Sequence, residues 1–413
     1  MGSPAPAQGG GRVLDPNRAP GATGSVTRAE VAEVLPRVAE IVADVRARGD
    51  AALVEWSERL DGERPRWLRV PREEIEHAEA DTAFLDAIRR LAAAVDAFHR
   101  PQRPPDTSVS PVEGVQAERR FLPVGSVGVY VPGGRASYPS SLVMTVVPAH
   151  VAGVERVCVC SPRPSASLLA TARELGVDEV YAVGGAQAVA ALAYGTETIP
   201  RVDKVVGPGN VFVQAAKLLV SGVVGIDLPA GPSEVVIVAD ETADPALCAA
   251  DLVAQAEHGP DSECLLLTSS LRLATEVARR VEGWSQVRVE VVSTLEEALA
   301  RAEAYAPEHL ELHVAAPEAV ASRVRNAGSV FLGKAAPAVL GDYASGANHV
   351  LPTGGLARGA GGLGLESFLK PVQYVSATLD GLARVRETVA ALAKAEGLPL
   401  HAAAVDARFG EGG

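Results

Sequence analysis

The feature that most constrains this chain is an alternation, after Arg119, of short β-branched runs with helical segments. The runs are SVGVYV, RVCVC, DEVYAV, DKVVG and VVGID, and after residue 233 they continue with EVVIVAD, ECLLLTS, VRVEVV and GSVFLG. Strands separated by helices indicate βαβ units and buried parallel sheets. Two such series in sequence predict an α/β protein with two sheets, each with its own core.

Helical patterns flank this alternation. Residues 27–62 and 84–101 have apolar positions at three- and four-residue steps, which predicts helices, with breaks at Pro36 and Gly49. At the other end, a glycine-rich passage at 354–364 precedes one long helix, LDGLARVRETVAALAKAEG, and a short tail. The last fifty residues therefore read as an appendage that needs a surface to dock on.

Composition excludes several classes of protein. With 38 Lys and Arg against 51 Asp and Glu, the net charge is −13, and no basic cluster suggests a nucleic-acid partner. No signal peptide is recognisable, and the uncharged stretch 136–154 is interrupted by prolines, so no membrane span is expected. The cysteines show no CxxC pair or secreted framework, which predicts reduced core residues of a cytoplasmic protein. They are Cys158, Cys160, Cys248 and Cys264.

Three glycine-rich turns follow strand-like runs in the first series: YVPGGRASYPSS, GGAQA and GPGN. No GxGxxG stands at a strand-to-helix junction, and no P-loop occurs. Each turn alone reads as an ordinary tight connection. Because the carboxyl ends of parallel strands share one sheet edge, the three together also suggest a nucleotide site.

The stretch DLVAQAEHGPDSE places Gln255 and His258 three apart on one face of a helix end. An imidazole and an amide oxygen could supply two ligands to zinc, with further donors from elsewhere. The alternative is that His258 only interacts with the helix dipole and the last carbonyl groups.

Three further stretches bring histidine and carboxylate side chains together. YAPEHLEL has Glu308 beside His309, which suits proton removal from an alcohol or water, although a solvated helix start is the alternative. GDYASGANHVLPT has the composition of a functional loop rather than a helix or strand, and EGLPLHAAAV ends the last helix. These two supply Asp342, Asn348, His349, Glu396 and His401.

Taken together, these motifs resemble the histidinol dehydrogenase family. The matching stretches run in family order from about residue 30 to the end: VGVYVPGG, GGAQAVAALAYGTETIPRVDKVVGPGN, GIDLPAGPSEVVIVAD, DLVAQAEHGPDSE, APEHLEL, GDYASGANHVLPT and EGLPLHAAAV. Ala347 departs from the family, which commonly has a hydroxyl residue there. The resemblance implies oxidation of L-histidinol to L-histidinal and then L-histidine, the final steps of histidine biosynthesis. It also implies two NAD reduced in turn and one zinc per subunit of a homodimer.

The resemblance also implies a set of site residues. Glu308 and His309 would be the acid/base pair. Zinc would be held by Gln255, His258, Asp342 and His401, the last from the partner subunit. Substrate would contact the same ligands and His309, together with Ser233, His349 and Glu396. NAD would contact Tyr130, Gln187 and Asn210, one from each glycine-rich turn.

The fold implied is α/β, with two incomplete Rossmann-like domains and small helical or extended terminal segments. We expect a flexible tail at 1–26, a first α/β domain at 27–125 with 234–353, and a second, NAD-side domain at 126–233. The appendage at 354–413 would dock on the partner subunit.

The first alternative function is a related zinc- and NAD-dependent dehydrogenase of another small polyol, such as a sulfonated diol, although Glu396 and His349 favour histidinol. The second is a catalytically silent zinc- or nucleotide-binding protein, which would be expected to have lost Glu308 or His309.

Overall fold

The computed structural model describes residues 13–14, 26–133, 138–228 and 231–410. It divides into two compact units. Unit 1 comprises Met1–Gln102 and Gly125–Ser367, and unit 2 comprises Arg103–Val124 and Phe368–Gly413. Unit 1 contains two parallel sheets with helices around each, so the predicted α/β class with two sheets is confirmed.

The first sheet of unit 1 has five parallel strands in the order β6-β5-β4-β7-β8. All five lie in the runs expected from sequence. The strands are β4 (Ser126–Tyr130), β5 (Arg156–Cys160), β6 (Val180–Tyr181), β7 (Lys204–Val206) and β8 (Gly225–Ile226). The helices between them are α5 (Pro139–Ala152), α6 (Ala166–Glu174), α7 (Gly185–Tyr194) and α8 (Val211–Val220).

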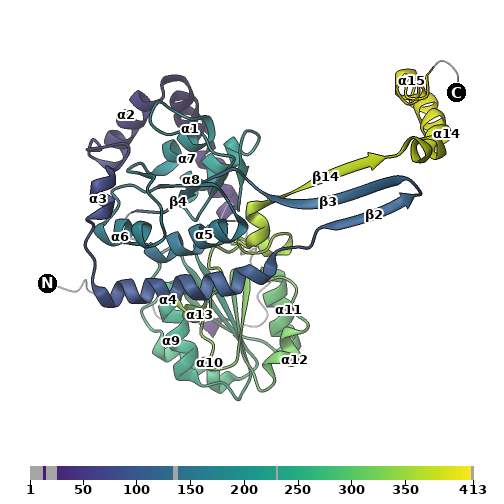
Figure 1. The fold of residues 1–413 in the computed structure, drawn as a ribbon. Coiled ribbons are helices and arrows are strands. Elements are labelled where there is room, and N and C mark those ends of the chain that lie inside the picture. Colours follow the sequence, from purple (N-terminus) through teal and green to yellow (C-terminus); the bar gives the residue numbers. More distant parts are fainter. Residues whose placement is uncertain (1–12, 15–25, 134–137, 229–230, 411–413) are drawn as a thin grey trace. The chain divides into compact units, whose positions relative to one another are not determined.

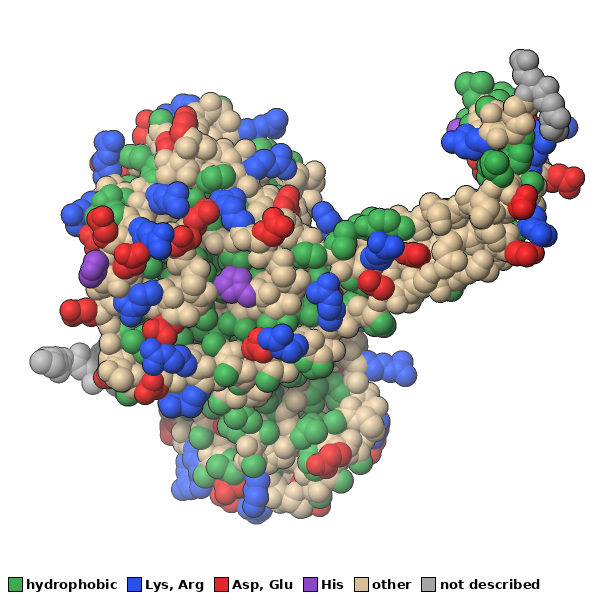
Figure 2. Space-filling view, in the orientation of Figure 1, with side chains coloured by type: hydrophobic (Ala, Val, Ile, Leu, Met, Phe, Trp, Pro, Cys, Tyr) green, Lys and Arg blue, Asp and Glu red, His purple; other side chains and the backbone are tan. Residues whose placement is uncertain are grey.

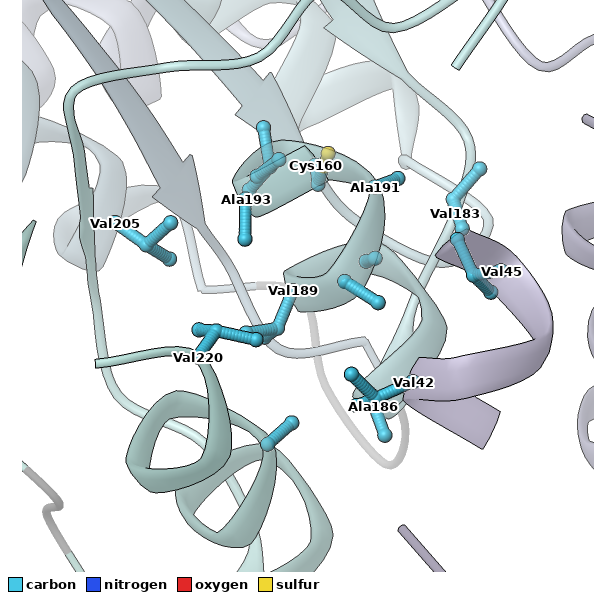
Figure 3. Close-up of a cluster of buried hydrophobic side chains, with 14 of the residues drawn as sticks. Val42, Val45, Cys160, Val183, Ala186, Val189, Ala191, Ala193, Val205 and Val220 are labelled. Atoms are coloured by element: carbon cyan, nitrogen blue, oxygen red, sulfur yellow. The ribbon is translucent and has the colours of Figure 1, made fainter. Parts of the chain in front are cut away.

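The N-terminal helices pack on this first sheet layer. They are α1 (Val26–Arg48), α2 (Asp50–Asp61), α3 (Arg72–Glu76) and α4 (Thr82–His99). Val42 and Val45 of α1 meet Ala186 and Val189 of α7 in one buried cluster (Figure 3). The sequence-based grouping attached residues 27–125 to the other sheet, whereas the helices of that segment pack against α5 to α8.

Pro36 does not break the first helix, contrary to expectation, and lies inside α1. Val38, Ile41 and Val45 beyond it are all buried. Burial of this stripe offsets the one backbone hydrogen bond that a proline removes. Gly49 does end the helix as predicted, with a φ of 55°.

The second sheet of unit 1 has six parallel strands in the order β1-β11-β10-β9-β12-β13. Side chains of β9 alternate between two cores, with Val235 and Ile237 on one face and Val236 and Val238 on the other. The strands are β1 (Val13–Leu14), β9 (Glu234–Ala239), β10 (Glu263–Thr268), β11 (Val287–Val291), β12 (His309–His313) and β13 (Ser329–Leu332). The helices are α9 (Pro245–Ala256), α10 (Leu271–Arg280), α11 (Leu295–Tyr305), α12 (Pro317–Ala321) and α13 (Ala338–Tyr343). Short 3₁₀ turns follow at η2 (Leu356–Arg358) and η3 (Leu365–Phe368), and another, η1 (Arg100–Gln102), follows α4.

Three elements of this half differ from the sequence-based expectation. The stretch HLELH, for which a solvated helix start was the alternative, is the buried strand β12, which pairs with β9. Asp342 was expected in a loop but lies on the short helix α13. Within the segment expected to be a flexible tail, β1 pairs as an edge strand with β11.

Unit 2 is built on a three-stranded antiparallel sheet in the order β14-β3-β2. Its strands are β2 (Thr107–Val112), β3 (Val115–Pro123) and β14 (Leu369–Ala377). The predicted long C-terminal helix is α14 (Leu379–Ala395), and a second helix, α15 (Pro399–Asp406), follows it. Apolar side chains of this unit are exposed, among them Val375 at 73% and Leu400 at 80%.

The surface and the cysteines agree with the composition. On the face seen in Figure 2, basic and acidic side chains are interspersed over unit 1. All four cysteines are free and buried, as predicted. Among the residues that the structure describes, no helix combines the length and apolarity needed to cross a membrane.

Candidate active site

A cavity of about 830 Å³ lies between the two sheets of unit 1. Its walls come from segments that follow the carboxyl ends of β4 and β7 and from segments at the amino ends of β9 and β12. The usual rule that ligands bind at carboxyl ends of strands therefore holds for the first sheet only. Seven of the residues predicted from sequence line the cavity: Asn210, Ser233, His258, Glu308, His309, Asp342 and His349.

Glu308 and His309 stand at the start of β12, and both are buried. Glu308 Oε2 accepts a hydrogen bond from the backbone N–H of Glu234 at 2.8 Å. His309 Nδ1 lies 3.1 Å from the backbone oxygen of Glu234. Because a carbonyl oxygen can only accept, Nδ1 carries the proton, and Nε2 of the neutral ring is left as an acceptor. The strand pair thus presents a buried base to the cavity.

Burial shifts the protonation of this pair. It raises the pKa of Glu308 well above its ordinary value. It lowers the pKa of His309 to about 4, an effect that the backbone contact with Glu234 opposes and the nearby His258 reinforces. At neutral pH His309 is therefore uncharged, and Glu308 holds a proton more readily than an exposed glutamate. The neutral ring of His309 can accept a proton, and Glu308 can do so in its ionised form.

Two metal-type donors, His258 and Asp342, line the same cavity as this pair, whereas Gln255 does not. Gln255 is the last but one residue of α9, and His258 follows the end of that helix, with its Nδ1 3.1 Å from the backbone oxygen of Gln255. The Nε2 atom of Gln255 is buried without a hydrogen-bond partner. Burial raises the pKa of Asp342, and the proximity of His258 opposes that shift.

These donors fit a zinc ion. A buried orphaned amide, an imidazole with a free Nε2 and a buried carboxylate are the N and O ligand types that zinc takes. Amide O and N atoms are assigned from hydrogen bonding, so the unpartnered end of Gln255 can equally be the oxygen.

His349 is held between two elements that line the cavity. Its Nε2 lies 3.2 Å from the hydroxyl of Ser141, and its Nδ1 lies 3.3 Å from the backbone oxygen of Asp342. The neighbouring Asn348 instead donates to the backbone oxygen of Met144 at 2.6 Å, so its role is structural. Burial lowers the pKa of His349 to about 4, so its ring is neutral near pH 7.

The three residues predicted for NAD are placed differently from one another. Asn210 lines the cavity, and its side chain caps α8 by accepting from the N–H groups of Phe212 and Val213. Tyr130 and Gln187 are buried and do not line it. Tyr130 accepts from the N–H of Gly185, and neither amide atom of Gln187 has a partner. An unsatisfied buried amide needs a ligand or water to complete it, so Gln187 fits a polar cofactor, whereas Tyr130 and Asn210 are already hydrogen-bonded within the chain.

Glu396 and His401 belong to unit 2. Glu396 caps the end of α14, and His401 lies on α15. Both side chains are exposed.

Sequence reasoning missed two groups of buried charged residues near the site. Glu234 starts β9 with only 6% of its surface exposed. Burial raises its pKa to about 7. Lys217 and Asp227 form an ion pair in which each side chain is 1% exposed, and it holds the GPGN turn through Gly207. The available signal was a charged residue in or beside an apolar run: Lys217 lies inside VFVQAAKLLV, and Glu234 directly precedes VVIVA.

The fold and the cavity define an α/β enzyme that combines a buried base pair with metal-type donors. A family model described as histidinol dehydrogenase matches residues 25–409. Histidinol dehydrogenase of Methanosarcina mazei is 46% identical over 92% of this chain and 93% of its own, and that of Thermobifida fusca is 47% identical over 93% and 94%. The crystal structure of histidinol dehydrogenase from Elizabethkingia anophelis has a TM-score of 0.85 at 35% identity, covering 91% of this chain and 92% of that one.

The chain therefore belongs to the histidinol dehydrogenase family. It is an oxidoreductase with a role in histidine biosynthesis, and the family and activity predicted from its motifs are confirmed.

Proposed function

We propose that the protein oxidises L-histidinol to L-histidinal and then to L-histidine, using zinc and two NAD. The observation that carries this proposal is the buried pair at the start of β12. His309 has its Nδ1 proton fixed by a backbone oxygen, so its other nitrogen is an acceptor, and Glu308 stands beside it in the same cavity. Family membership supplies the substrate class.

His309 and Glu308 divide the proton transfers between them. In the first oxidation, Nε2 of His309 takes the hydroxyl proton as hydride leaves the carbinol carbon. Glu308 then takes a proton from the water that adds to the aldehyde. His309 returns its proton to the aldehyde oxygen as the hydrate forms and is neutral again. The hydrate has a hydrogen on the same carbon, so His309 can take a hydroxyl proton again as the second hydride leaves and the carboxylic acid forms. In its ionised form Glu308 is the stronger base of the two, because burial raises its pKa and lowers that of His309.

Zinc, when bound, would supply a template that holds the amino and imidazole nitrogens of the substrate. Gln255, His258 and Asp342 would hold the metal, with the partner subunit's His401 as the fourth ligand. The orphaned amide of Gln255 supports this assignment. Ser233, His349 and Glu396 would orient the substrate, with Glu396 again from the partner.

NAD, when bound, would supply the hydride acceptor. Tyr130, Gln187 and Asn210 would contact it: Tyr130 ends β4, Gln187 lies in the first turn of α7, and Asn210 caps α8 after β7. The two unsatisfied amide atoms of Gln187 support a polar ligand on this side, which corresponds to the domain proposed at 126–233.

A homodimer completes the proposal. The appendage at 354–413 includes exposed apolar side chains together with exposed Glu396 and His401. Exposed apolar surface of this kind favours docking on another chain. Four free, buried cysteines support a reducing compartment, and we propose the cytoplasm.

The test is a stoichiometric assay of the purified protein with L-histidinol. We expect two NADH per histidine formed, and loss of activity after treatment with a strong chelator that added zinc reverses. Oxidation of another alcohol without turnover of histidinol would contradict the proposal.

A further inference from the structure

A cluster of ionisable side chains lies near the cavity but does not line it. It consists of Asp251 on α9 and of Glu311 and His313 on β12, whose ligand-type atoms all lie within 4.8 Å of one another. Glu311 is 0% exposed and His313 is 4% exposed. None of the three is used in the mechanism proposed above, although burying such groups is costly.

The cluster joins three elements by direct contacts. Nε2 of His313 lies 3.1 Å from Oε2 of Glu311 and 3.5 Å from Oδ2 of Asp251. The other oxygen of Glu311 accepts from the backbone N–H of Ala338 at 2.6 Å. Since Ala338 is the first residue of α13, Glu311 connects β12 to the start of that helix, and His313 connects β12 to α9.

The contacts within the cluster shift the protonation of two of its members. Burial disfavours a charged His313, but the contacts with Cys248 and Glu311 outweigh it and raise the pKa of His313 to about 10. The pKa of Asp251 is raised to about 7, mainly by burial and to a smaller extent by the nearby charge of Glu311. Nε2 of His313 faces both carboxylates, whereas its Nδ1 is buried without a hydrogen-bond partner. Because the nitrogen that faces the carboxylates is already engaged, the cluster favours a bridging role over a metal site.

Each joined element also bears a residue of the proposed site. Gln255 follows Asp251 on α9 by about one helical turn, and Asp342 follows Ala338 on α13 by the same interval. On β12, His309 and Glu311 are alternate residues of one strand. A shift of α9 or α13 against β12 would therefore displace the metal-type donors relative to the base.

We propose that Asp251, Glu311 and His313 form a buried clasp that positions the zinc-bearing helices α9 and α13 against the strand of the catalytic base. The clasp residues are positioning residues, and the inference rests on the zinc ligands proposed above. Residues that orient metal ligands without touching the metal are important for binding, and replacing them commonly changes metal affinity.

The first test measures zinc retention in the full-length protein. Loaded His313→Gln and Glu311→Gln should lose zinc to a chelator at least about ten-fold faster than wild type, the lower end of the range for such residues. Thr171→Val is the matched control, because Thr171 is fully buried on α6 and donates one hydrogen bond, to Ser167. It should lose stability without losing zinc faster.

A milder pair of variants covers the case in which those proteins do not fold. Asp251→Leu removes the acceptor that faces His313, whereas Asp251→Asn keeps one. We expect fast zinc loss from the first and near wild-type retention in the second. Equal retention in both would overturn the clasp.

A second measurement uses the metal-free protein. Amide hydrogen exchange at 245–256 should be faster in His313→Gln and in Asp251→Leu than in wild type or Thr171→Val, because α9 loses its contact with β12. Unchanged exchange would overturn the clasp. A wild-type protein that binds no zinc would contradict the proposed function, and this exchange measurement would still decide the inference.

The saturating zinc content distinguishes the clasp from a second metal site. The clasp predicts one zinc per subunit in wild type and in His313→Gln. A fall from two to one in that variant would mean that the cluster itself binds metal, and would overturn the inference.

Discussion

Glu234 and Glu308 stand at the starts of the neighbouring strands β9 and β12, and the side chain of each accepts a hydrogen bond from the backbone N–H of the other. Oε2 of Glu308 accepts from the N–H of Glu234 at 2.8 Å, and Oε2 of Glu234 accepts from the N–H of Glu308 at 3.3 Å. The remaining oxygen of Glu234 accepts from Gly354 at 2.8 Å. This reciprocal pair fixes the start of β12 against β9, and with it the position of both proposed bases.

The first prediction concerns the pH dependence of stability. The pKa of Glu234 rises from 4.5 to about 7 in the folded chain because the group is buried, so the folded chain binds this proton more tightly than the unfolded chain does. The resulting stabilisation is complete below pH 4.5 and is lost as the pH rises through about 7. Glutamine does not titrate. The free energy of unfolding of Glu234→Gln should therefore rise, relative to that of wild type, by on the order of 3 kcal/mol between about pH 4.5 and pH 7.5.

Urea unfolding of the metal-free proteins at about pH 5 and pH 8 measures this gain. At the lower pH the variant should be the less stable protein, because one backbone N–H loses its acceptor, at a cost of about 1–3 kcal/mol. Glu282→Gln, at an exposed position, is the control. A difference from wild type that is the same at both pH values would contradict the prediction.

The second prediction separates the two oxidations. Glu308→Gln keeps an oxygen that can accept from Glu234 but cannot take a proton from water. With L-histidinal as substrate, kcat should fall by roughly 10²–10⁴. In a single turnover with L-histidinol, the first NADH should still form at a rate much closer to wild type. Stopped-flow absorbance follows both, with Glu257→Gln, an exposed residue at the end of α9, as control. Equal losses in the two steps would assign Glu308 a different role.

Runs of β-branched residues predicted most of the strands, because strands buried on both faces need apolar side chains throughout. The same rule explains why β12 was missed. Its sequence alternates histidine and glutamate with leucine, yet all five residues are buried. The polar side chains are paired with one another and with neighbouring elements, which no local pattern reveals.

Other misses have similar physical causes. The strands of unit 2 are rich in polar side chains and mostly exposed, so they lack the apolar signal of a core strand. The motifs predicted seven residues that now line one cavity, because each motif ends at a sheet edge or helix end. Glu234, within the stretch GIDLPAGPSEVVIVAD, was not predicted as a site residue, because its partners Glu308 and Gly354 are far away in sequence.

The third prediction tests the buried ion pair behind the cofactor-side turn. Asp227 accepts from the N–H of Gly207 at 2.6 Å, and Lys217 donates to Asp227 and to the oxygen of the same glycine. Lys217→Met leaves Asp227 buried without a countercharge and should cost about 3–5 kcal/mol in the free energy of unfolding.

Adding Asp227→Asn to this variant should recover part of that loss, because the amide oxygen still accepts from Gly207 while the uncompensated charge is gone. Urea denaturation measures both. The KM for NAD should rise in the single variant, since Asn210 lies on the same turn. A cost below about 1 kcal/mol for Lys217→Met would mean that the pair is dispensable.

The last prediction asks which chain supplies His401. A chain carrying His401→Ala and a chain carrying Glu308→Ala should each be inactive as homodimers. If the partner subunit's His401 completes each site, a mixed dimer has one intact site, formed by the first chain's cavity and the second chain's histidine. Tandem purification with two different tags isolates mixed dimers, which should show about half the wild-type activity per dimer.

Mixed dimers of His309→Ala with Glu308→Ala are the control and should stay inactive, because both residues line the cavity within one unit. Recovery in the control alone, or in neither mixture, would place His401 outside a shared site.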